Sequence, residues 1–261
     1  WNMGDEMIRS DQILKTVSMI QRENLDVRTI TLGLNLLDCH DPDVEAACRK
    51  VADKIESYAG NLVSACDEMA TRYGVPIVNR RLAVSPLADV GAGLSADGFV
   101  RLARAVDGAA TRVGIDFAGG YSAQVEKGES EADRTLIDAL PEALATTSRL
   151  CASVNVATTR AGVNMDAVAR LGQTIHELAE RTADRDGIGC TRLVVFANQP
   201  QDNPFMAGAY HGHGEPEAVI NVGVSGPGVV ARALERRIES AGAENLGLDD
   251  LAEEIKQTSV R

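Results

Sequence analysis

Apolar, β-branched runs alternate with amphipathic stretches along the chain, and this alternation predicts strands separated by helices. The six runs that we expect to form strands are Val27–Leu37, Val75–Val84, Arg112–Ala118, Leu150–Ala157, Thr191–Asn198 and Ala218–Val224. Several of these runs are apolar almost without interruption, which is typical of parallel strands covered on both faces. The repeated order of strand and helix predicts one α/β sheet or barrel with right-handed crossovers.

The stretches between the runs have the three-to-four-residue apolar spacing of helices. The longest is predicted to run from Asp41 to Tyr73, with Asp41 as the cap and Pro42 in the first helical position. Further helices are predicted to begin at Ser95, at Asn164 and at Val229. Pro141 interrupts another helical stretch and is predicted to begin a second short helix after Leu140.

The length and composition indicate one globular α/β domain over residues 1–261, with residues 1–6 as a non-native or disordered leader. A chain of 261 residues can bury a full hydrophobic core, but its aromatic share of 3% leaves the packing to aliphatic side chains. The five cysteines are odd in number and form no C-x-x-C pair, which fits free thiols in a reducing compartment. We therefore expect a cytoplasmic protein.

The charge of the chain bears on its partners. The formal net charge of −12 gives the protein a field that repels polyanions. We therefore expect neither nucleic acid nor membrane as a partner.

Each predicted strand carries one polar side chain that does not fit an apolar run. These residues are Asn35, Asn79, Asp116, Asn155, Asn198 and Asn221. A buried polar group without a partner costs about 1–3 kcal/mol, so we expect all six to be hydrogen-bonded. Two interpretations stay open: each side chain fixes a neighbouring loop, or the six share a site at the carboxyl ends of the strands, where α/β proteins bind ligands.

Asp116 is the first candidate for a catalytic group in such a shared site. Arg80 or Arg81 is the expected countercharge, because alternation along a strand points one of the two toward the same face. Together with Asn79, Asn155, Asn198 and Asn221, Arg80 is predicted to bind the substrate.

The segment Asp202–Glu217, DNPFMAGAYHGHGEPE, is polar and glycine-rich, as in a loop that closes over a site. We expect His211 and Glu215 to face the substrate as catalytic groups, with Asn203 binding it. An extended backbone would also place His211, His213 and Glu215 on one side, within reach of a divalent metal ion. The glycines leave that geometry unfixed, so a metal is the less favoured interpretation.

The segment INVGVSGPGVV predicts a strand, a small-residue turn and a helix. Ser225 is a good helix cap, and the free N–H groups after Gly226 and Gly228 can hold a phosphate or carboxylate. These three residues are therefore predicted to bind an anionic group.

Four segments carry a resemblance to a known family: LDVRTITLGLNLLDCHDPD, DFAGGYSAQVEKG, CASVNVATTRAGVNMDAV and FANQPQDNPFMAGAYHGHGEPEAVINVGVSGPGVV. From about residue 7 onward the chain resembles the PFL-like family of unknown function from bacteria and archaea. The resemblance implies parallel β/α units forming about half of a ten-stranded PFL-like α/β barrel, like that of pyruvate formate-lyase, and a homodimer. Family members are longer, which implies a fragment or a separate chain that completes the barrel.

Three hypotheses about function follow. The first is an enzyme acting on a small anionic metabolite at the carboxyl ends of the parallel strands. The second is a non-catalytic metabolite-sensing or scaffold protein of the same fold. The third is a structural half whose polar strand residues bond to the rest of the barrel.

Overall fold

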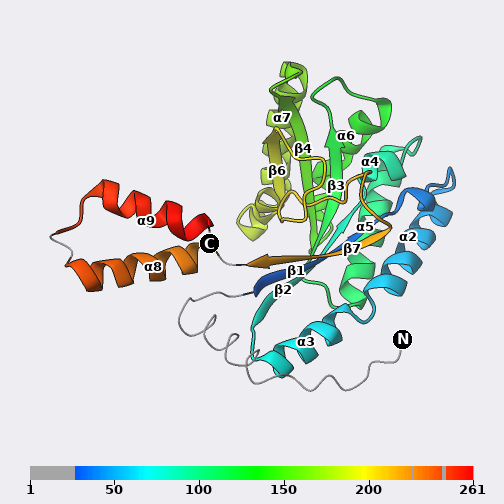
Figure 1. Cartoon of the computed structure of the whole chain (residues 1–261). Helices are drawn as coiled ribbons and strands as arrows, with labels where there is room; N and C mark the ends of the chain where they lie inside the picture. The colour runs from blue at the N-terminus through cyan, green and yellow to red at the C-terminus, as the bar shows by residue number, and fades with distance from the viewer. Residues whose placement is uncertain (1–26, 225, 243–244, 261) are drawn as a thin grey trace. The chain divides into compact units, whose positions relative to one another are not determined.

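The chain forms a mixed α/β structure around one seven-stranded sheet (Figure 1). The computed structural model describes residues 27–224, 226–242 and 245–260, so the predicted leader at residues 1–6 lies outside the described residues. The strands lie in the order β5 (Gly162–Val163), β4 (Leu150–Thr158), β3 (Phe117–Gln124), β2 (Ile77–Val84), β1 (Val27–Leu34) and β7 (Ala218–Val224), and β6 (Leu193–Ala197) pairs with β4.

The directions of the strands make this sheet mixed rather than wholly parallel. β2 with β3, β3 with β4 and β4 with β6 are parallel pairs, while β5 is antiparallel to β4. The backbone N–H of Asn35, just after β1, donates to the carbonyl of Glu217, just before β7, at 2.9 Å. Strand β7 therefore begins where β1 ends and runs back along it, which corrects the expectation of a parallel strand there.

Helices follow the strands in sequence and pack on one another. Their bounds are α2 (Val44–Ala59), α3 (Leu62–Tyr73), α4 (Leu87–Val90), α5 (Ala96–Arg112), α6 (Glu131–Ala145), α7 (Met165–Arg181), α8 (Gly226–Ala241) and α9 (Leu248–Val260), with short 3-10 turns at Leu37–Cys39, Ala183–Arg185 and Ile188–Arg192. Helix α2 packs on α5, α5 on α6 and α6 on α7. These helices and the strands share one core of buried aliphatic side chains.

The chain divides into two compact units. The larger comprises Ile30–Val63 and Asn79–Asn221 and holds most of the sheet with α2, α4, α5, α6 and α7. The smaller comprises Ser64–Val78, Val222–Arg261 and the segment that ends at Thr29, and in it α8 packs against α9. Nothing in this division tests the expected single domain, which stays a prediction.

The predicted strands agree with the sheet except around β3. Arg112–Ala118 is wrong as a strand, because Arg112 ends α5 and β3 begins at Phe117. Gly119 and Gly120, which directly follow the predicted strand, lie inside β3. Glycine runs are typical of turns, so sequence alone favours the wrong assignment where glycines lie within a strand.

The predicted helices differ from the structure mainly at their ends. The stretch from Asp41 to Tyr73 is two helices, broken at Gly60, and the cap of the first is Asp43, which accepts from the Glu45 N–H at 3.2 Å. The helix predicted from Val229 begins at Gly226.

Helix α6 also corrects one prediction. Pro141 stays inside it, where burial between neighbouring elements outweighs one lost backbone hydrogen bond. At the start of this helix, Ser130 and Asp133 form a reciprocal capping box.

Asp116 lies at the amino end of β3 and fastens it to β2. Its backbone N–H donates to the Arg80 carbonyl at 2.9 Å, and its Oδ2 accepts from the Arg80 N–H at 2.8 Å. The amino and carboxyl ends of parallel strands lie at opposite edges of a sheet. The prediction that Asp116 belongs to the carboxyl-end site is therefore wrong in its placement.

The glycine-rich segment after β6 packs closely on the sheet. A Cβ on Gly33 of β1 would lie 2.5 Å from His211 Nδ1, and one on Gly119 of β3 would lie 2.4 Å from the carbonyl oxygen of Ala209. The His211 N–H donates to the Val84 carbonyl at the end of β2, at 2.9 Å. Because alternate strand residues point to opposite faces, the segment covers the face away from the core that Leu32 and Leu34 enter.

No helix among the described residues combines the length and the apolar character that crossing a membrane would require.

Replacing Gly119 by alanine tests the close packing of this segment. The new methyl group would collide with the backbone of Ala209, so we expect Gly119→Ala to lower the free energy of unfolding by about 1–3 kcal/mol. Gly172, inside α7, is the matched control, because a Cβ at that position would have no atom within 4 Å. Gly172→Ala should raise the stability by about 0.5–1 kcal/mol through helix propensity. Urea unfolding of both variants measures the difference, and equal stabilities would contradict the packing.

Replacing Asp116 by alanine tests its structural role. Asp116→Ala removes an acceptor from the Arg80 N–H, so we expect a loss of about 1–3 kcal/mol in urea unfolding. The exposed Asp138 on α6 is the control, and Asp138→Ala should stay within about 0.5 kcal/mol of the parent. An Asp116→Ala chain of unchanged stability would show that the hydrogen bond does not hold the strands together.

Candidate functional site

Asn155 lies near the carboxyl end of β4, at the edge where a site is expected. Its Oδ1 accepts from the Gln199 N–H at 3.4 Å. The Gln199 side chain then donates to Ser153 Oγ at 3.3 Å and to the Gly208 carbonyl at 2.9 Å. Asn155 thus helps to fix the segment that follows β6.

Asn198 and Asn203 also hydrogen-bond to neighbouring backbone. Asn198 Oδ1 accepts from the Thr159 N–H at 2.7 Å, across the loop after β4. Asn203 donates to the Gly208 carbonyl at 3.1 Å and accepts from the Phe205 N–H at 3.1 Å. For these amides the geometry favours the first of our two interpretations, in which each side chain fixes a loop.

Asn35, at the end of β1, belongs to a small charged cluster. Its Nδ2 donates to Glu217 Oε2 at 2.9 Å, and its Oδ1 accepts from Ser85 Oγ at 3.2 Å. Lys54 forms ion pairs with Glu217 and with Asp38, the latter at 2.6 Å. The hydrogen bond from Lys54 lowers the pKa of the Glu217 carboxyl and also that of Asp38. This cluster fastens the start of β7 to the end of β1.

His211 is buried by the same segment and is only 2% exposed. Its Nε2 lies 2.7 Å from the Pro216 carbonyl, and its Nδ1 lies 3.9 Å from Asp202 Oδ1. The neighbouring Tyr210 hydroxyl donates to the Pro200 carbonyl, and burial raises the pKa of that hydroxyl to about 12. His211 therefore packs against the sheet, and this placement does not support the role of a substrate-facing acid or base.

His213 and Glu215 lie on the exposed part of the segment. His213 Nε2 is 3.1 Å from Asp89 Oδ2, on α4, and burial raises the pKa of that carboxyl. Within the part of the chain that the structure describes, no three histidine, cysteine, aspartate or glutamate side chains gather as a metal site. His211, His213 and Glu215 are thus not brought together.

The other predicted site residues lie elsewhere. Asn79 and Arg80 are near the amino end of β2, beside Asp116, and Asn221 is in the middle of β7. Gly226 and Gly228 form the first turn of α8, in the smaller unit, and Ser225 lies outside the described residues. Within the larger unit, Asn79 and Arg80 therefore lie with Asp116 at the amino ends of β2 and β3, away from Asn155 and Asn198.

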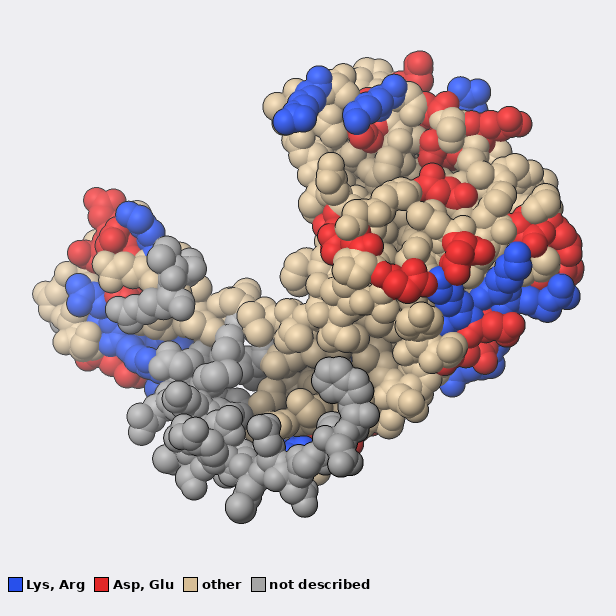
Figure 2. Space-filling model, turned by 45° about the vertical axis from the view of Figure 1, so that its right-hand side comes forward, with Lys and Arg blue, Asp and Glu red and all other residues tan. Residues whose placement is uncertain are grey.

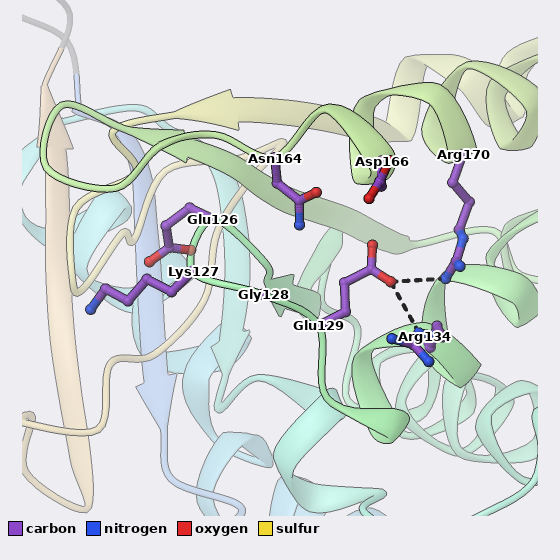
Figure 3. Close-up of a pocket in the computed structure, with 8 residues that line it drawn as sticks. All are labelled: Glu126, Lys127, Gly128, Glu129, Arg134, Asn164, Asp166 and Arg170. Carbon is purple, nitrogen blue, oxygen red and sulfur yellow. Dashed lines mark hydrogen bonds and ion pairs between the residues drawn. The ribbon is translucent and has the colours of Figure 1, made fainter.

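A groove does open at the carboxyl ends of β3 and β4, and none of its lining residues is among those predicted from the sequence. It encloses about 590 Å³ (Figure 3). Its lining residues come from the loop after β3, the first turn of α6, and the cap and first two turns of α7: Glu126, Lys127, Gly128, Glu129, Arg134, Asn164, Asp166 and Arg170. All of them belong to the larger unit.

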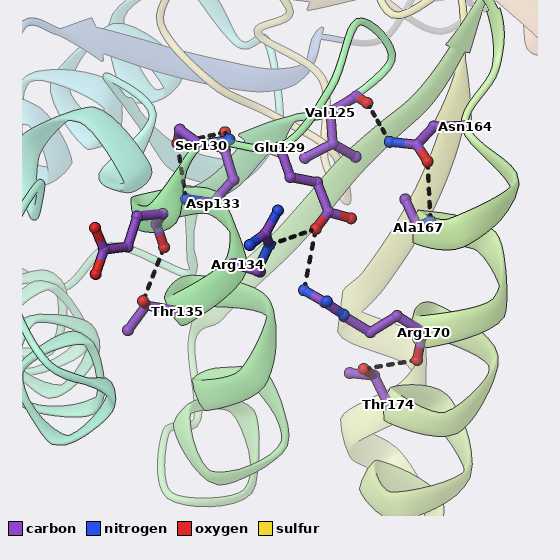
Figure 4. Close-up of polar contacts among 11 residues, drawn as sticks. Val125, Glu129, Ser130, Asp133, Arg134, Thr135, Asn164, Ala167, Arg170 and Thr174 are labelled. Carbon is purple, nitrogen blue, oxygen red and sulfur yellow. Dashed lines mark hydrogen bonds and ion pairs between the residues drawn. The ribbon is translucent and has the colours of Figure 1, made fainter.

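Glu129 is the centre of this groove. Its side chain is only 7% exposed, and its Oε2 accepts from Arg134 Nε at 3.3 Å and from Arg170 Nη1 at 3.1 Å (Figure 4). Its Oε1 is buried without a hydrogen-bond partner among the described residues. One carboxylate oxygen therefore joins the loop after β3 to two helices, and the other is left for a further donor.

Capping side chains position the two helices at the groove. Ser130 Oγ accepts from the Asp133 N–H at 3.1 Å and begins α6. Asn164 Oδ1 accepts from the Ala167 N–H at 3.1 Å and begins α7, while its Nδ2 donates to the Val125 carbonyl at 2.8 Å. Asn164 thus fixes the start of α7 to the end of β3.

The groove combines both signs of charge. Three of its lining residues are acidic and three are basic, although the whole chain carries a net charge of −12. On the face drawn in Figure 2, basic side chains likewise lie among acidic ones. The lining as a whole is therefore neutral, and its excess of positive charge is confined to Arg134 and Arg170, which together face the single carboxylate of Glu129.

One sequence signal points to these residues. The segment QVEKGES places three charged residues around a glycine directly after a buried strand, which is typical of a ligand-binding loop in an α/β sheet. The apolar pattern ends that strand too early, at Ala118 rather than Gln124, so the segment does not stand out from sequence alone. The contribution of Arg170 is long-range and needs the fold.

Comparisons with known proteins identify the family. Residues 18–261 match the family model described as "Uncharacterised ACR (DUF711)". The UPF0210 proteins of Oleidesulfovibrio alaskensis and of Desulforudis audaxviator are 55% and 56% identical to the chain over 255 residues. That of Methanosarcina mazei is 51% identical over 255 residues.

In each of these three comparisons the alignment covers 98% of this chain and 55% of the relative, so the chain spans about half the length of the curated relatives it matches. The high identity over nearly the whole chain and the match to the family model agree. The chain therefore belongs to the DUF711 (UPF0210) family of uncharacterised proteins.

Proposed function

We propose that the chain binds a small anionic metabolite in the groove at the carboxyl ends of β3 and β4. The observation that carries this proposal is the convergence of Arg134 and Arg170 on one oxygen of Glu129. Two guanidinium groups against one carboxylate leave a net positive charge at the base of the groove. A carboxylate or phosphate is the group that such a pair of arginines binds best.

The geometry of the guanidinium groups supports the same proposal. Arg134 uses its Nε, and Arg170 uses its Nη1, in the contact with Glu129. The other N–H groups of these two side chains take no part in the contact with Glu129. Because each guanidinium is held in place by Glu129, little side-chain entropy is lost when a ligand binds to the remaining donors.

We propose further that the bound metabolite is a substrate. Glu129 Oε1, which is buried and has no donor among the described residues, is a suitable acceptor for a proton from the ligand. This role replaces the catalytic roles that the sequence predicts for Asp116, His211 and Glu215. In the alternative function, as a sensor or scaffold, the same groove binds the metabolite and leaves it unchanged.

The two functions differ in a direct measurement. An enzyme should deplete one compound from a metabolite mixture, with a bell-shaped dependence of rate on pH. A sensor should be stabilised against heat by a compound that is recovered intact.

We also propose that the sheet is part of a larger PFL-like barrel that acts as a cytoplasmic homodimer. The relatives are about twice as long as the chain, which leaves room for further strands, on this chain or on a separate one. Ile220, Val222 and Val224, on one face of β7, are 54%, 57% and 55% exposed. Such a row of exposed aliphatic side chains on an edge strand is typical of a surface that another element covers.

Replacing Arg170 by glutamine tests the proposed anion site. We expect the Arg170→Gln chain to bind succinate or inorganic phosphate about ten-fold more weakly than the parent in calorimetric titrations, because one charge-assisted contact is lost. Arg181 is the matched control, since it lies on the same helix and also forms an ion pair with a glutamate. Arg181→Gln should bind these anions as the parent does.

A second variant, Arg134→Gln, distinguishes a loss of anion binding from a loss of folding in Arg170→Gln. The Arg134 side chain is 57% exposed, so Arg134→Gln should leave the circular dichroism spectrum and the unfolding midpoint nearly unchanged. If folded Arg134→Gln and Arg170→Gln both bind the anions like the parent, or if the parent binds neither anion, the proposed site is wrong.

A further inference from the structure

We infer that the ligand of this groove carries an ammonium group as well as its anionic group, as a free amino acid does. The inference rests on the proposed function and deepens it by naming the class of ligand. In this arrangement Arg134 and Arg170 bind the ligand carboxylate. Glu129 Oε1 and Asp166 accept hydrogen bonds from its ammonium group.

The first observation is the unpartnered oxygen of Glu129. The side chain is only 7% exposed, and its Oε2 already accepts hydrogen bonds from both arginines. Its Oε1 is buried and lacks a donor among the described residues. A buried carboxylate oxygen that lacks a donor is unfavourable, so a ligand that brings an N–H donor to this point gains affinity.

The second observation is the placement of Asp166. It lies in the first turn of α7, two residues after the capping Asn164. Figure 3 shows its carboxylate directed toward the same part of the groove as the free oxygen of Glu129, whereas the two guanidinium groups lie on the other side of Glu129. The free oxygen of Glu129 and the Asp166 carboxylate therefore lie on one side of the Glu129 carboxyl group, and the two guanidinium groups lie on the other.

The third observation is the balance of charge. The lining has three acidic and three basic side chains, and a zwitterionic ligand adds no net charge to it. A dianion would bring a second negative charge near Asp166, which has no ion pair among the described residues, whereas an ammonium group would supply a countercharge. The volume of about 590 Å³ is in the range typical of small-molecule sites.

A divalent metal ion is a weaker candidate for the same two carboxylates. Arg134 and Arg170 contact the Glu129 carboxylate directly. Their positive charges repel a divalent metal ion more strongly than a singly charged ammonium group. No group of three potential metal ligands occurs in the described part of the chain. An ammonium group, with one charge and three N–H donors, fits these acceptors better.

Calorimetric titration with matched pairs of ligands tests the inference. The pairs are L-aspartate with succinate, L-glutamate with glutarate and L-alanine with propionate, in which the second member lacks the amino group. We expect the amino acid of at least one pair to bind the 261-residue chain about ten-fold more tightly than its partner, for one charge-assisted contact. Mg²⁺ alone serves as a further probe.

The outcomes separate this inference from the proposed function. If the deaminated acids bind as tightly as the amino acids, or if Mg²⁺ binds and the amino acids do not, the ammonium inference is wrong. In the first case Arg170→Gln still weakens binding, and the anion site stands. If neither member of any pair binds, the proposed anion site and the inference both fail.

Asp166→Asn gives a second test, which leaves the buried Glu129 side chain unchanged. The substitution should weaken binding of the preferred amino acid about ten-fold and leave binding of its deaminated partner unchanged. Asp97→Asn is the matched control, because Asp97 occupies the same position in the first turn of α5, two residues after the capping Ser95. Equal losses for both members of the pair would assign Asp166 to the structure of the helix and overturn its role toward ammonium.

Discussion

The contact of Glu129 with Arg134 and Arg170 is the interaction on which the candidate site depends. It joins the loop after β3 to the first turn of α6 and the second turn of α7. A nearly buried carboxylate needs this compensation, because an unpaired charge at that depth would be strongly unfavourable. The same contact holds two guanidinium groups in fixed positions, so that what stabilises the local structure also prepares a site for an anion.

A second constraint explains why the most conspicuous segment of the sequence is not the site. The polar residues between Asp202 and Glu217 suggest a mobile lid, but Ala209 and His211 pack on strand glycines. Hydrogen bonds of Gln199 and Asn203 hold the segment to the sheet and to itself. The polar side chains of the segment thus hydrogen-bond to backbone groups of the same segment. These backbone groups need partners because the segment covers a buried face of the sheet. The groove lies at the carboxyl ends of β3 and β4, and no residue of this segment lines it.

The fold could be predicted from the sequence to the extent that it depends on local patterns. The apolar runs identify β4 and β7 almost to the residue, and Ser95 and Asn164 are the expected caps of α5 and α7. The errors occur where a long-range contact decides. Gly119 lies in a strand at a point where the backbone of Ala209 leaves no room for a side chain, whereas a glycine pair in isolation predicts a turn.

The candidate site was less predictable than the fold. The polar strand residues were expected at one edge, and Asn155 and Asn198 do lie there. Asp116 lies at the opposite edge because its strand begins later than the apolar pattern indicates. The residues of the groove follow the ends of strands, as expected for an α/β protein, but their pairing joins residues up to 41 positions apart. Spacing along the chain gives no sign of such a pair.

A crystal structure of the chain grown with L-aspartate tests the central claim most directly. The expected result is electron density for the amino acid in the groove, with a carboxylate on Arg134 and Arg170 and the amino group within hydrogen-bonding distance of Glu129 Oε1 and Asp166. Density for the ligand at another place, or a structure in which Glu129 Oε1 is bonded to a protein donor and the groove is filled by side chains, would contradict it.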